Sequence, residues 1–433
     1  MNAAVASWGR YPHANQRVLR INDRSAPLPG FEGHALPRGN GRSYGDVCLD
    51  DGGTLLDSHG LDRFIAFDAR SGVLRCESGV LLGDILDLAV PRGWFLPVAP
   101  GTRYVSIGGA IANDVHGKNH HRVGSFGCHL RAFELLRSDG SRMHCTVDDN
   151  PDWFAATIGG LGLTGFVTWA ELQLLPVPGA WFETETHCYS RLDDFFELSA
   201  DSEPRWAYTV AWLDCTAKGR TLGRGVFSRG NHSPDTGDLR VPREGKLRIP
   251  VTPPFSLVNG LSLRVFNALY FARAPHQPRR SLQHYRPWLF PLDGVREWNR
   301  MYGPRGFLQY QCVLPPENAR DGVAELLARI AASGAGSFLT VLKQFGAIAS
   351  PGLLSFPRQG TTLAIDFALR GESTFTLLTE LDDVVTAAGG AVYPAKDARM
   401  SAAMFRHSFP AWQAFEQYVD PRFSSGFRRR VME

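Results

Sequence analysis

The chain of 433 residues is 44% hydrophobic, and its 46 basic and 43 acidic residues leave a formal net charge of +3. This length supports two domains with substantial cores, and the near balance of charge argues against a nucleic-acid partner. Seven scattered cysteines, none in a CxxC pair, indicate reduced thiols rather than a disulfide framework or a zinc site.

The chain also lacks the usual sequence features of secreted and membrane-spanning proteins. Residues 1–17 contain no uninterrupted apolar segment of the kind found in a secretory signal. No run of about eighteen apolar residues occurs, which argues against an ordinary spanning helix. We therefore expect a cytoplasmic protein.

The first informative motif is a glycine-rich loop at residues 37–46, PRGNGRSYGD. Its glycine spacing differs from the dinucleotide fingerprint of Rossmann folds, and no GK[ST] follows to complete a P-loop. Taken alone, the loop is also explained by a tight turn. A second glycine-rich stretch further along the chain favours nucleotide binding.

Regular elements separate these two stretches. Residues 54–57 and 72–77 are predicted to be short strands between turn residues. Residues 81–90 carry apolar side chains at helical spacing, and Pro91 with Gly93 ends this helix.

The second stretch, residues 100–127, is the most informative part of the sequence. Gly108 and Gly109 precede a small apolar run, which is typical of a turn that opens a helix. The exposed N–H groups of such a turn form a ready site for a phosphate. A polar run with three histidines and a lysine follows at 116–121, so we interpret this stretch as the centre of a flavin nucleotide site.

Three further elements complete the first half of the chain. Residues 130–136 and 142–146 flank a Ser-Asp-Gly turn, which is a hairpin signal. Residues 152–158 are predicted to be helical. An apolar strand is expected at 166–175, and two prolines follow it.

The second half of the sequence has a different pattern of predicted strands and helices. Strands are expected at 206–213, 306–313, 337–343 and 361–369, and helices at 318–332 and 373–388. Strands followed by helices, twice over, indicate an α+β domain with helices on one face of a largely antiparallel sheet. The proline-rich interval 232–292 mixes arginines with aromatic residues and shows no clean amphipathic helix. We expect it to form a mobile lid, and contact with a membrane surface is the alternative.

These observations predict two domains. Residues 1–179 form the first, a cofactor-binding domain that residues 391–433 complete. Residues 180–390 form a substrate-binding domain with the mobile insert at 232–292.

The chain resembles the flavoenzymes of the vanillyl-alcohol oxidase type, which carry the PCMH-type two-subdomain FAD-binding fold. Within that family it is most similar to members that oxidise a ribose linked to a lipid phosphate. The motifs that carry the resemblance are RGNGRSYGD (38–46), PGTRYVSIGGAIANDVHGKNHH (100–121), GSFG (124–127), GGLGLTG (159–165), EWNRMYGPRGFLQYQ (297–311), LSFP (354–357) and YPAKDAR (393–399).

The resemblance implies a non-covalent FAD whose pyrophosphate lies against main-chain N–H groups of the loops at 39–45 and 106–109. The residues that match the family's flavin contacts are Arg38, Gly39, Asn40, Gly41, Arg42, Ser43, Tyr44, Gly45, Asp46, Gly101, Thr102, Ser106, Ile107, Gly108, Gly109, Asn113, His116, Val167 and Tyr393. The segment before residue 37 is shorter than in relatives and shows no clear β-α-β unit, so we expect either that the adenine end is held differently or that FAD binds more weakly.

The reaction implied is oxidation of the C2 hydroxyl of a polyprenylphosphoryl-β-D-ribose to the 2-keto sugar, by hydride transfer to flavin N5. A short-chain reductase partner then completes a 2-epimerisation. Lys396 matches the family's catalytic lysine, and His116 and Tyr44 are the other catalytic candidates. The candidate substrate-binding residues are Lys118, Gln309, Gln311, Lys343, Tyr302 and Thr362.

Other interpretations of the same residues remain open. His116 can be a structural histidine, and the glycine-rich setting of the neighbouring histidines does not favour a metal site. Gln309 and Gln311 are two apart and face the same side of a strand, where they form either a site or an ordinary polar face. A sugar or aldonolactone oxidase of the same fold, and a non-catalytic protein that binds a lipid-linked sugar, are the alternative functions.

Overall fold

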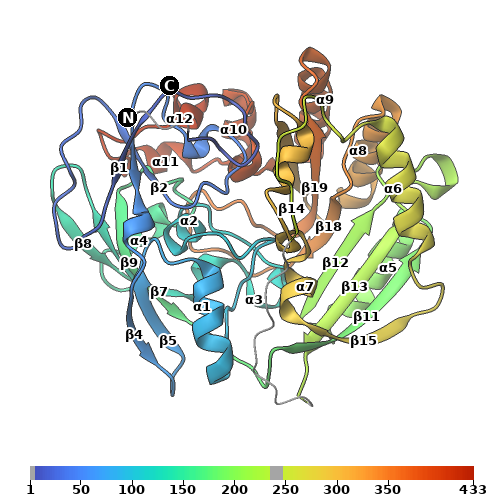
Figure 1. Ribbon diagram of the computed structural model, residues 1–433, viewed down its shortest axis with the longest axis horizontal. Coiled ribbons are helices and arrows are strands. Elements are labelled where there is room, and N and C mark those ends of the chain that lie inside the picture. Colours follow the sequence, from blue (N-terminus) through green and yellow to red (C-terminus); the bar gives the residue numbers. More distant parts are fainter. Residues whose placement is uncertain (1–4, 235–246) are drawn as a thin grey trace.

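The computed structural model describes residues 5–234 and 247–433. It has two halves (Figure 1). One contains the smaller sheets of the amino-terminal region, and the other is built on one large sheet with helices packed against it. The two termini lie near each other on the first half, because the last helices of the chain return to it.

The first half contains three small sheets. A parallel sheet has the order β1-β3-β2, formed by β1 (Arg17–Arg20), β3 (Thr54–Asp57) and β2 (Ala35–Arg38). An antiparallel sheet has the order β4-β5-β9-β7-β8, formed by β4 (Phe64–Asp68), β5 (Val73–Glu77), β9 (Phe166–Gln173), β7 (Leu130–Leu136) and β8 (Arg142–Cys145). The third is a short pair, β6 (Trp94–Phe95) with β10 (Leu175–Pro176).

Burial along β9 shows how the five-stranded sheet forms its core. Buried residues alternate with half-buried ones along this strand, so one face points inward. The helices whose apolar residues join the core of this half are α1 (Leu82–Ala89), α2 (Ile107–Ala112) and α4 (Pro151–Thr157). The short helix α3 (His120–Val123) lies against the large sheet.

The large sheet has eight strands, and every neighbouring pair is antiparallel. Its order is β15 (Arg279–His284), β11 (Trp181–Tyr189), β13 (Gly225–His232), β12 (Tyr208–Leu213), β18 (Thr340–Phe345), β19 (Gly360–Ala368), β17 (Phe307–Leu314) and β20 (Ala391–Val392). The helices α5 (Leu192–Ser202), α8 (Ala319–Ser333) and α9 (Glu372–Ala387) pack on one face. The predicted α+β class with a largely antiparallel sheet is confirmed.

The interval 232–292 contains more regular structure than the sequence suggested. Within its described part, β15 extends the large sheet, and β14 (Leu247–Arg248) pairs with β16 (Val295–Arg296). The same part contains two helices, α6 (Gly260–Ala272) and α7 (Tyr285–Leu289). The side chain of Asn259 accepts hydrogen bonds from two amides of the first turn of α6 and so starts the helix. Residues 235–246 of the predicted mobile insert lie outside the described residues. The insert's mobility and the domain boundaries stay predictions.

No helix in the described residues is long and apolar enough to cross a membrane.

The last part of the chain ties the two halves together. The strand β20 belongs to the large sheet, and α10 (Ala402–Ser408) packs against β20 and α9, whereas α11 (Trp412–Glu416) and α12 (Gly426–Val431) return to the first half. On α12, Arg430 lies 2.7 Å from a carboxylate oxygen of Asp46 and 3.0 Å from one of Asp397. Both carboxylates are buried, so one guanidinium neutralises two buried charges from distant parts of the sequence.

We expect Arg430→Ala to destabilise the folded protein by about 3 kcal/mol, because removing one partner leaves buried carboxylates uncompensated. Urea unfolding followed by circular dichroism measures the change. The matched control is Arg329→Ala on α8, whose partner Glu325 is half exposed and whose pair contributes about 0.5 kcal/mol. Equal losses in both variants would contradict the role of Arg430.

Candidate active site

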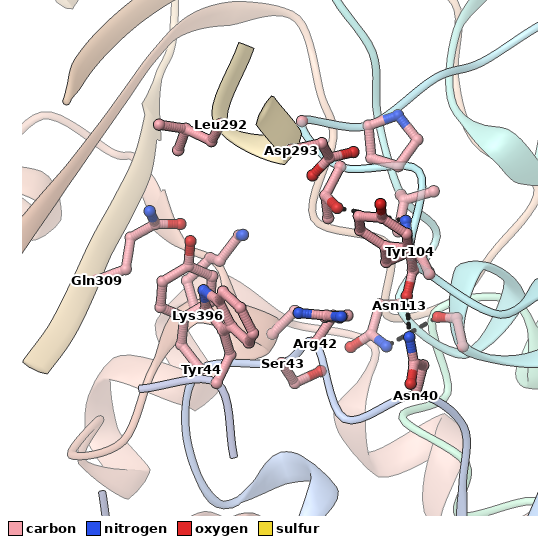
Figure 2. A pocket seen from close by; sticks show the side chains of 18 of the residues that line it. Asn40, Arg42, Ser43, Tyr44, Tyr104, Asn113, Leu292, Asp293, Gln309 and Lys396 are labelled. Carbon is pink, nitrogen blue, oxygen red and sulfur yellow. Dashed lines mark hydrogen bonds between the residues drawn. The ribbon is translucent and has the colours of Figure 1, made fainter. Parts of the chain in front are cut away.

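A cavity of about 1600 Å³ is lined by both halves of the protein. From the first half come the two glycine-rich stretches that the sequence singled out, and from the second half comes the face of the large sheet that its helices leave open. Figure 2 shows Gln309, Tyr44 and Lys396 on one side of this cavity and Asn40, Tyr104 and Asn113 on the other.

The two glycine-rich stretches touch each other at Gly39. A Cβ atom at this position would lie 2.0 Å from the hydroxyl oxygen of Ser106, which itself accepts a hydrogen bond from the amide of Gly109 and caps α2. Beside this contact, the side chain of Asn40 donates to the carbonyl oxygen of Tyr104 at 2.7 Å (Figure 2). Glycine is therefore required at position 39, since any side chain would separate the two loops.

We expect Gly39→Ala to lower the affinity for a bound cofactor at least about tenfold, because relieving the overlap displaces the loop that carries the cavity wall. The flavin absorbance of purified protein, relative to its absorbance at 280 nm, measures retention. Gly30→Ala is the matched control, since a Cβ there meets no atom within 4 Å. Circular dichroism must show a folded variant, and unchanged flavin content in Gly39→Ala would contradict the prediction.

The main-chain amides at 107–109 were expected to bind the pyrophosphate of FAD, but they are already hydrogen-bonded within the protein. Those of Ile107, Gly108 and Gly109 already donate within the protein, to Val80 O, Ser78 O and the hydroxyl of Ser106. They are not free to bind a pyrophosphate, because the turn before α2 is fastened to the strand-to-helix connection at 78–81. This part of the sequence interpretation is wrong.

Other polar groups in the cavity are available to bind a ligand. Four cavity-lining residues bear a buried side-chain atom for which the described residues provide no hydrogen-bond partner, namely Arg38 Nε, Arg42 Nε, Ser78 Oγ and Asn113 Oδ1. Buried polar atoms are normally paired, so these atoms indicate a polar ligand. Three of these atoms belong to the two glycine-rich stretches and the fourth to Ser78, and this distribution in a cavity of about 1600 Å³ fits a dinucleotide such as FAD.

Tyr393 closes one wall of the cavity. Its hydroxyl donates to the carbonyl oxygen of Asn113 at 2.7 Å, and its ring stacks on Phe356 with centroids 4.5 Å apart. The contact joins the segment after β20 to the end of α2. It places an aromatic ring from the last part of the chain beside the second glycine-rich stretch.

Lys396 lies over the ring of Tyr44, with Nζ 4.1 Å from the ring centroid. Burial lowers the pKa of Lys396 to about 8, and the carboxylate of Asp366 opposes this shift. Burial raises the pKa of Asp366 to about 7, although Gln309 donates to this carboxylate at 2.6 Å. The cation is therefore available near neutral pH on this side of the cavity.

Three further candidates form a connected group. Gln311 Nε2 lies 2.8 Å from His116 Nε2, and Lys343 Nζ lies 3.3 Å from His116 Nδ1. Burial, and then the positive charge of Lys343, holds the pKa of His116 well below its usual range. His116 is thus a neutral imidazole, and Gln309 and Gln311 point from β17 into the same cavity as the sequence predicted.

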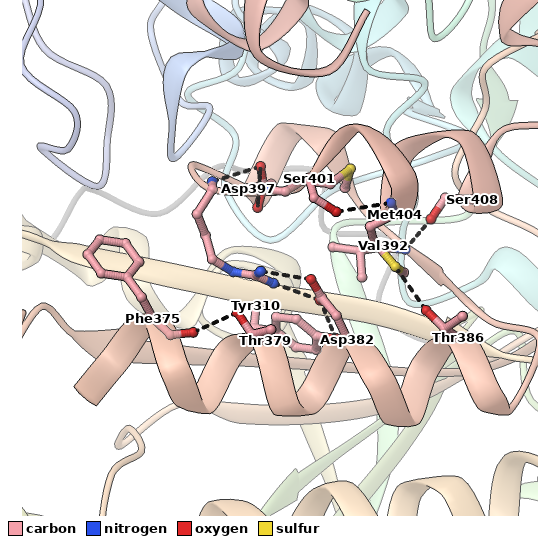
Figure 3. Close-up of polar contacts among 12 residues, drawn as sticks. Tyr310, Phe375, Thr379, Asp382, Thr386, Val392, Asp397, Ser401, Met404 and Ser408 are labelled. Carbon is pink, nitrogen blue, oxygen red and sulfur yellow. Dashed lines mark hydrogen bonds and ion pairs between the residues drawn. The ribbon is translucent and has the colours of Figure 1, made fainter. Parts of the chain in front are cut away.

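A network of hydrogen bonds and an ion pair at the residues that follow Lys396 fixes the position of this lysine. Arg399 forms two contacts with Asp382 on α9, at 2.6 and 2.7 Å, and Tyr310 donates to the same carboxylate. The carboxylate of Asp397 accepts from the amides of Arg399 and Met400 (Figure 3). Lys396 therefore projects from a segment that is fastened on both sides, which limits where its ammonium group can go.

Comparison with known proteins identifies the family. The FAD binding domain family matches residues 31–146. Human Delta(24)-sterol reductase is 33% identical over 109 residues, 25% of this chain and 21% of that protein. An uncharacterized protein of Streptomyces coelicolor is 36% identical over 81% of this chain and 100% of its own length. Decaprenylphosphoryl-beta-D-ribose oxidase of Mycolicibacterium smegmatis is 35% identical over 449 aligned residues, which span 99% of this chain and 97% of that protein.

The chain belongs to the decaprenylphosphoryl-beta-D-ribose oxidase family. The predicted FAD-binding fold of the PCMH type is confirmed, and the protein is an FAD-dependent oxidoreductase. The similarity also covers the segment before residue 37, where the resemblance was weakest.

Five residues that the family resemblance suggested do not line the cavity: Gly45, Asp46, Ile107, Tyr302 and Thr362. Gly45 packs against Asp397, Asp46 binds Arg430, and Ile107 lies in the core. Tyr302 donates to Asp366, and Thr362 accepts from Gln311, so these two act on residues of the cavity rather than on its contents. The other candidates of the sequence analysis do line it, and their roles stay predictions.

The structure also adds residues to the candidate site that the sequence analysis did not identify. Asp366 lies in a strand of apolar residues, and a lone carboxylate in such a strand was a signal that could have found it. Trp288 and Ser228 reach the cavity from α7 and β13 and carry no sequence signal of their own.

Proposed function

We propose that the protein oxidises the C2 hydroxyl of a polyprenylphosphoryl-β-D-ribose to the 2-keto sugar, the first half of a 2-epimerisation. The observation that carries this proposal is the buried group of Lys396, Tyr44 and His116, which lines a cavity that fits FAD, in a chain similar over 99% of its length to an oxidase of such a lipid-linked ribose.

The residues near Lys396 suit oxidation of an alcohol. FAD, when bound, would supply the hydride acceptor for this oxidation. Lys396, as an ammonium group, stabilises negative charge that develops on the C2 oxygen. The neutral imidazole of His116 can take up the hydroxyl proton, and the amides of Gln309 and Gln311 hold the sugar hydroxyls in orientation.

Completion of the epimerisation requires a second enzyme. A keto sugar regains a hydroxyl of opposite configuration only when hydride arrives on the other face. The short-chain reductase partner and a contact with a membrane surface stay predictions from the resemblance and from the composition of the 232–292 interval.

Anaerobic spectroscopy tests the proposed function. Purified protein should show the flavin absorbance near 450 nm, a band that flavins share. We expect farnesylphosphoryl-β-D-ribose to bleach it, whereas free ribose and an aldonolactone should not. Bleaching by the lactone or free sugar alone would assign the protein to the sugar and aldonolactone oxidases. No bleaching by any of them, with FAD bound, would favour the non-catalytic alternative.

A further inference from the structure

Lysine is rare in this chain and concentrated at one place. Of 46 basic residues only five are lysine, and three of them, Lys118, Lys343 and Lys396, line the same cavity. Arginine supplies almost all other positive charge in the chain. Lysine differs from arginine in carrying a compact ammonium group, which binds phosphate as a point charge.

Lys118 and Lys343 are left without a negative partner. Lys118 Nζ donates to the carbonyl oxygen of Trp288 at 2.5 Å, and Lys343 Nζ contacts His116. Across residues 5–234 and 247–433, no carboxylate lies within ion-pair distance of either lysine. Burial lowers the pKa of both to about 7, and the charge of Lys118 contributes to the lowering at Lys343. An anion between them would stabilise both ammonium groups.

The sheet register places a hydroxyl on the same face. Ser228 on β13 lies opposite Val210 on β12, and the pairing of β12 with β18 puts Lys343 on the other side of Val210. The indole N–H of Trp288 donates to the Ser228 hydroxyl at 3.0 Å, and the main chain of Trp288 holds Lys118. Two ammonium groups and a hydroxyl thus border one end of the cavity.

The next row across the sheet is apolar. It consists of Val226, Trp212 and Val341, which are paired neighbours on β13, β12 and β18 and all line the cavity. Tyr270 of α6 lies against Trp212, with ring centroids 4.5 Å apart. The lining therefore changes from cationic to apolar over one strand repeat, along the direction of the strands.

This apolar row continues to the surface of the protein. Tyr270 is 45% exposed and stacks on Phe266, which is 40% exposed. Leu269 and Val265 on the same helix are exposed as well, each by more than half. A ligand with an anionic group followed by a hydrocarbon chain matches this order of surfaces, because each part meets groups of its own kind.

We propose that Lys118, Lys343 and Ser228 bind the phosphate of the lipid-linked sugar, and that Val226, Trp212, Val341 and Tyr270 receive the first isoprenoid units of its chain. The remaining units leave over the apolar side of α6. This inference rests on the proposed function for the identity of the lipid and deepens it by assigning where the phosphate and the chain are recognised.

Calorimetric titration of the FAD-loaded enzyme with farnesyl phosphate, dimethylallyl phosphate and farnesol tests both parts. We expect farnesyl phosphate to bind at least about tenfold more tightly than either of the others, since farnesol lacks the phosphate and dimethylallyl phosphate has only one isoprenoid unit to place against the apolar row. Lys118→Met, which keeps the apolar stem, should weaken farnesyl phosphate about tenfold or more and leave farnesol unchanged. Val341→Thr, which keeps the volume and adds a hydroxyl, should weaken farnesyl phosphate and farnesol, and it should also weaken dimethylallyl phosphate, whose single isoprenoid unit lies against the same row.

Lys218→Met is the matched control, because Lys218 is exposed and does not line the cavity. An unchanged flavin spectrum shows that each variant is folded and loaded. The proposal is overturned if wild-type enzyme does not bind farnesyl phosphate, if chain length has no effect, or if Lys118→Met leaves its affinity unchanged. Binding as expected without bleaching by the lipid-linked ribose would refute the proposed function alone, and bleaching with an unaffected Lys118→Met would refute the phosphate site alone.

Discussion

Lys396→Ala is expected to lower the rate of substrate-driven flavin reduction by about 10²–10³-fold while the protein keeps its yellow colour. The ammonium group lies over the ring of Tyr44 on one side of the cavity, and it is not among the buried polar atoms of the cavity that lack a partner within the described residues. Its loss therefore removes charge stabilisation at the reacting oxygen and leaves the cofactor contacts in place. Stopped-flow absorbance at 450 nm under anaerobic conditions gives the rate.

Two comparisons separate this role from a structural one. Lys218→Ala removes an exposed lysine and should leave the rate unchanged. Lys396→Arg keeps the positive charge, but its larger planar group does not fit the position of an ammonium group over Tyr44, so only partial recovery is expected. A Lys396→Ala enzyme that reduces its flavin at the wild-type rate would rule out the proposed role.

The second large effect is a dependence of the rate on pH. Burial lowers the pKa of Lys396 to about 8, so the ammonium form is present below this pH and is lost above it. If the reaction needs the cation, the rate of flavin reduction should be constant below about pH 8. Above that pH it should fall about tenfold for each further pH unit, as for any single titrating group.

Asp366 provides the means to test which group titrates. Its carboxylate raises the pKa of Lys396, so Asp366→Asn should move the falling limb to lower pH, by roughly one unit. Asp383→Asn is the control, since this residue is exposed on α9 and outside the cavity. A falling limb that stays in place in Asp366→Asn would mean that another group controls the alkaline side.

The glycine-rich stretches were the part of the site that the sequence predicted best. Their function depends on a close approach of two main-chain segments, and a glycine in the sequence indicates such an approach. Gly39 is the example, because its Cα lies so close to Ser106 that a Cβ would overlap it. The paired glutamines were also placed correctly, because the two-residue repeat of a strand fixes which side chains share a face. Both conclusions follow from local rules.

The errors arose where partners come from distant parts of the chain. The amides of Ile107 and Gly108 look free in the sequence, and only the contact with residues 78–80 occupies them. The strands β11 and β13 gave no distinct signal, since polar and charged residues such as Glu185 and Arg229 pair with each other within the sheet. The helix α6 was missed because most of its apolar residues are exposed, so its pattern does not follow a buried stripe.

The return of the last helices to the first half has a consequence for synthesis of the protein. Strand β2 forms a bridge with Phe423, Arg430 holds Asp46, and the catalytic candidate Lys396 belongs to the same closing segment. During synthesis, the wall of the cavity that Tyr393 and Lys396 form is therefore absent until this closing segment has been made and has packed onto the first half.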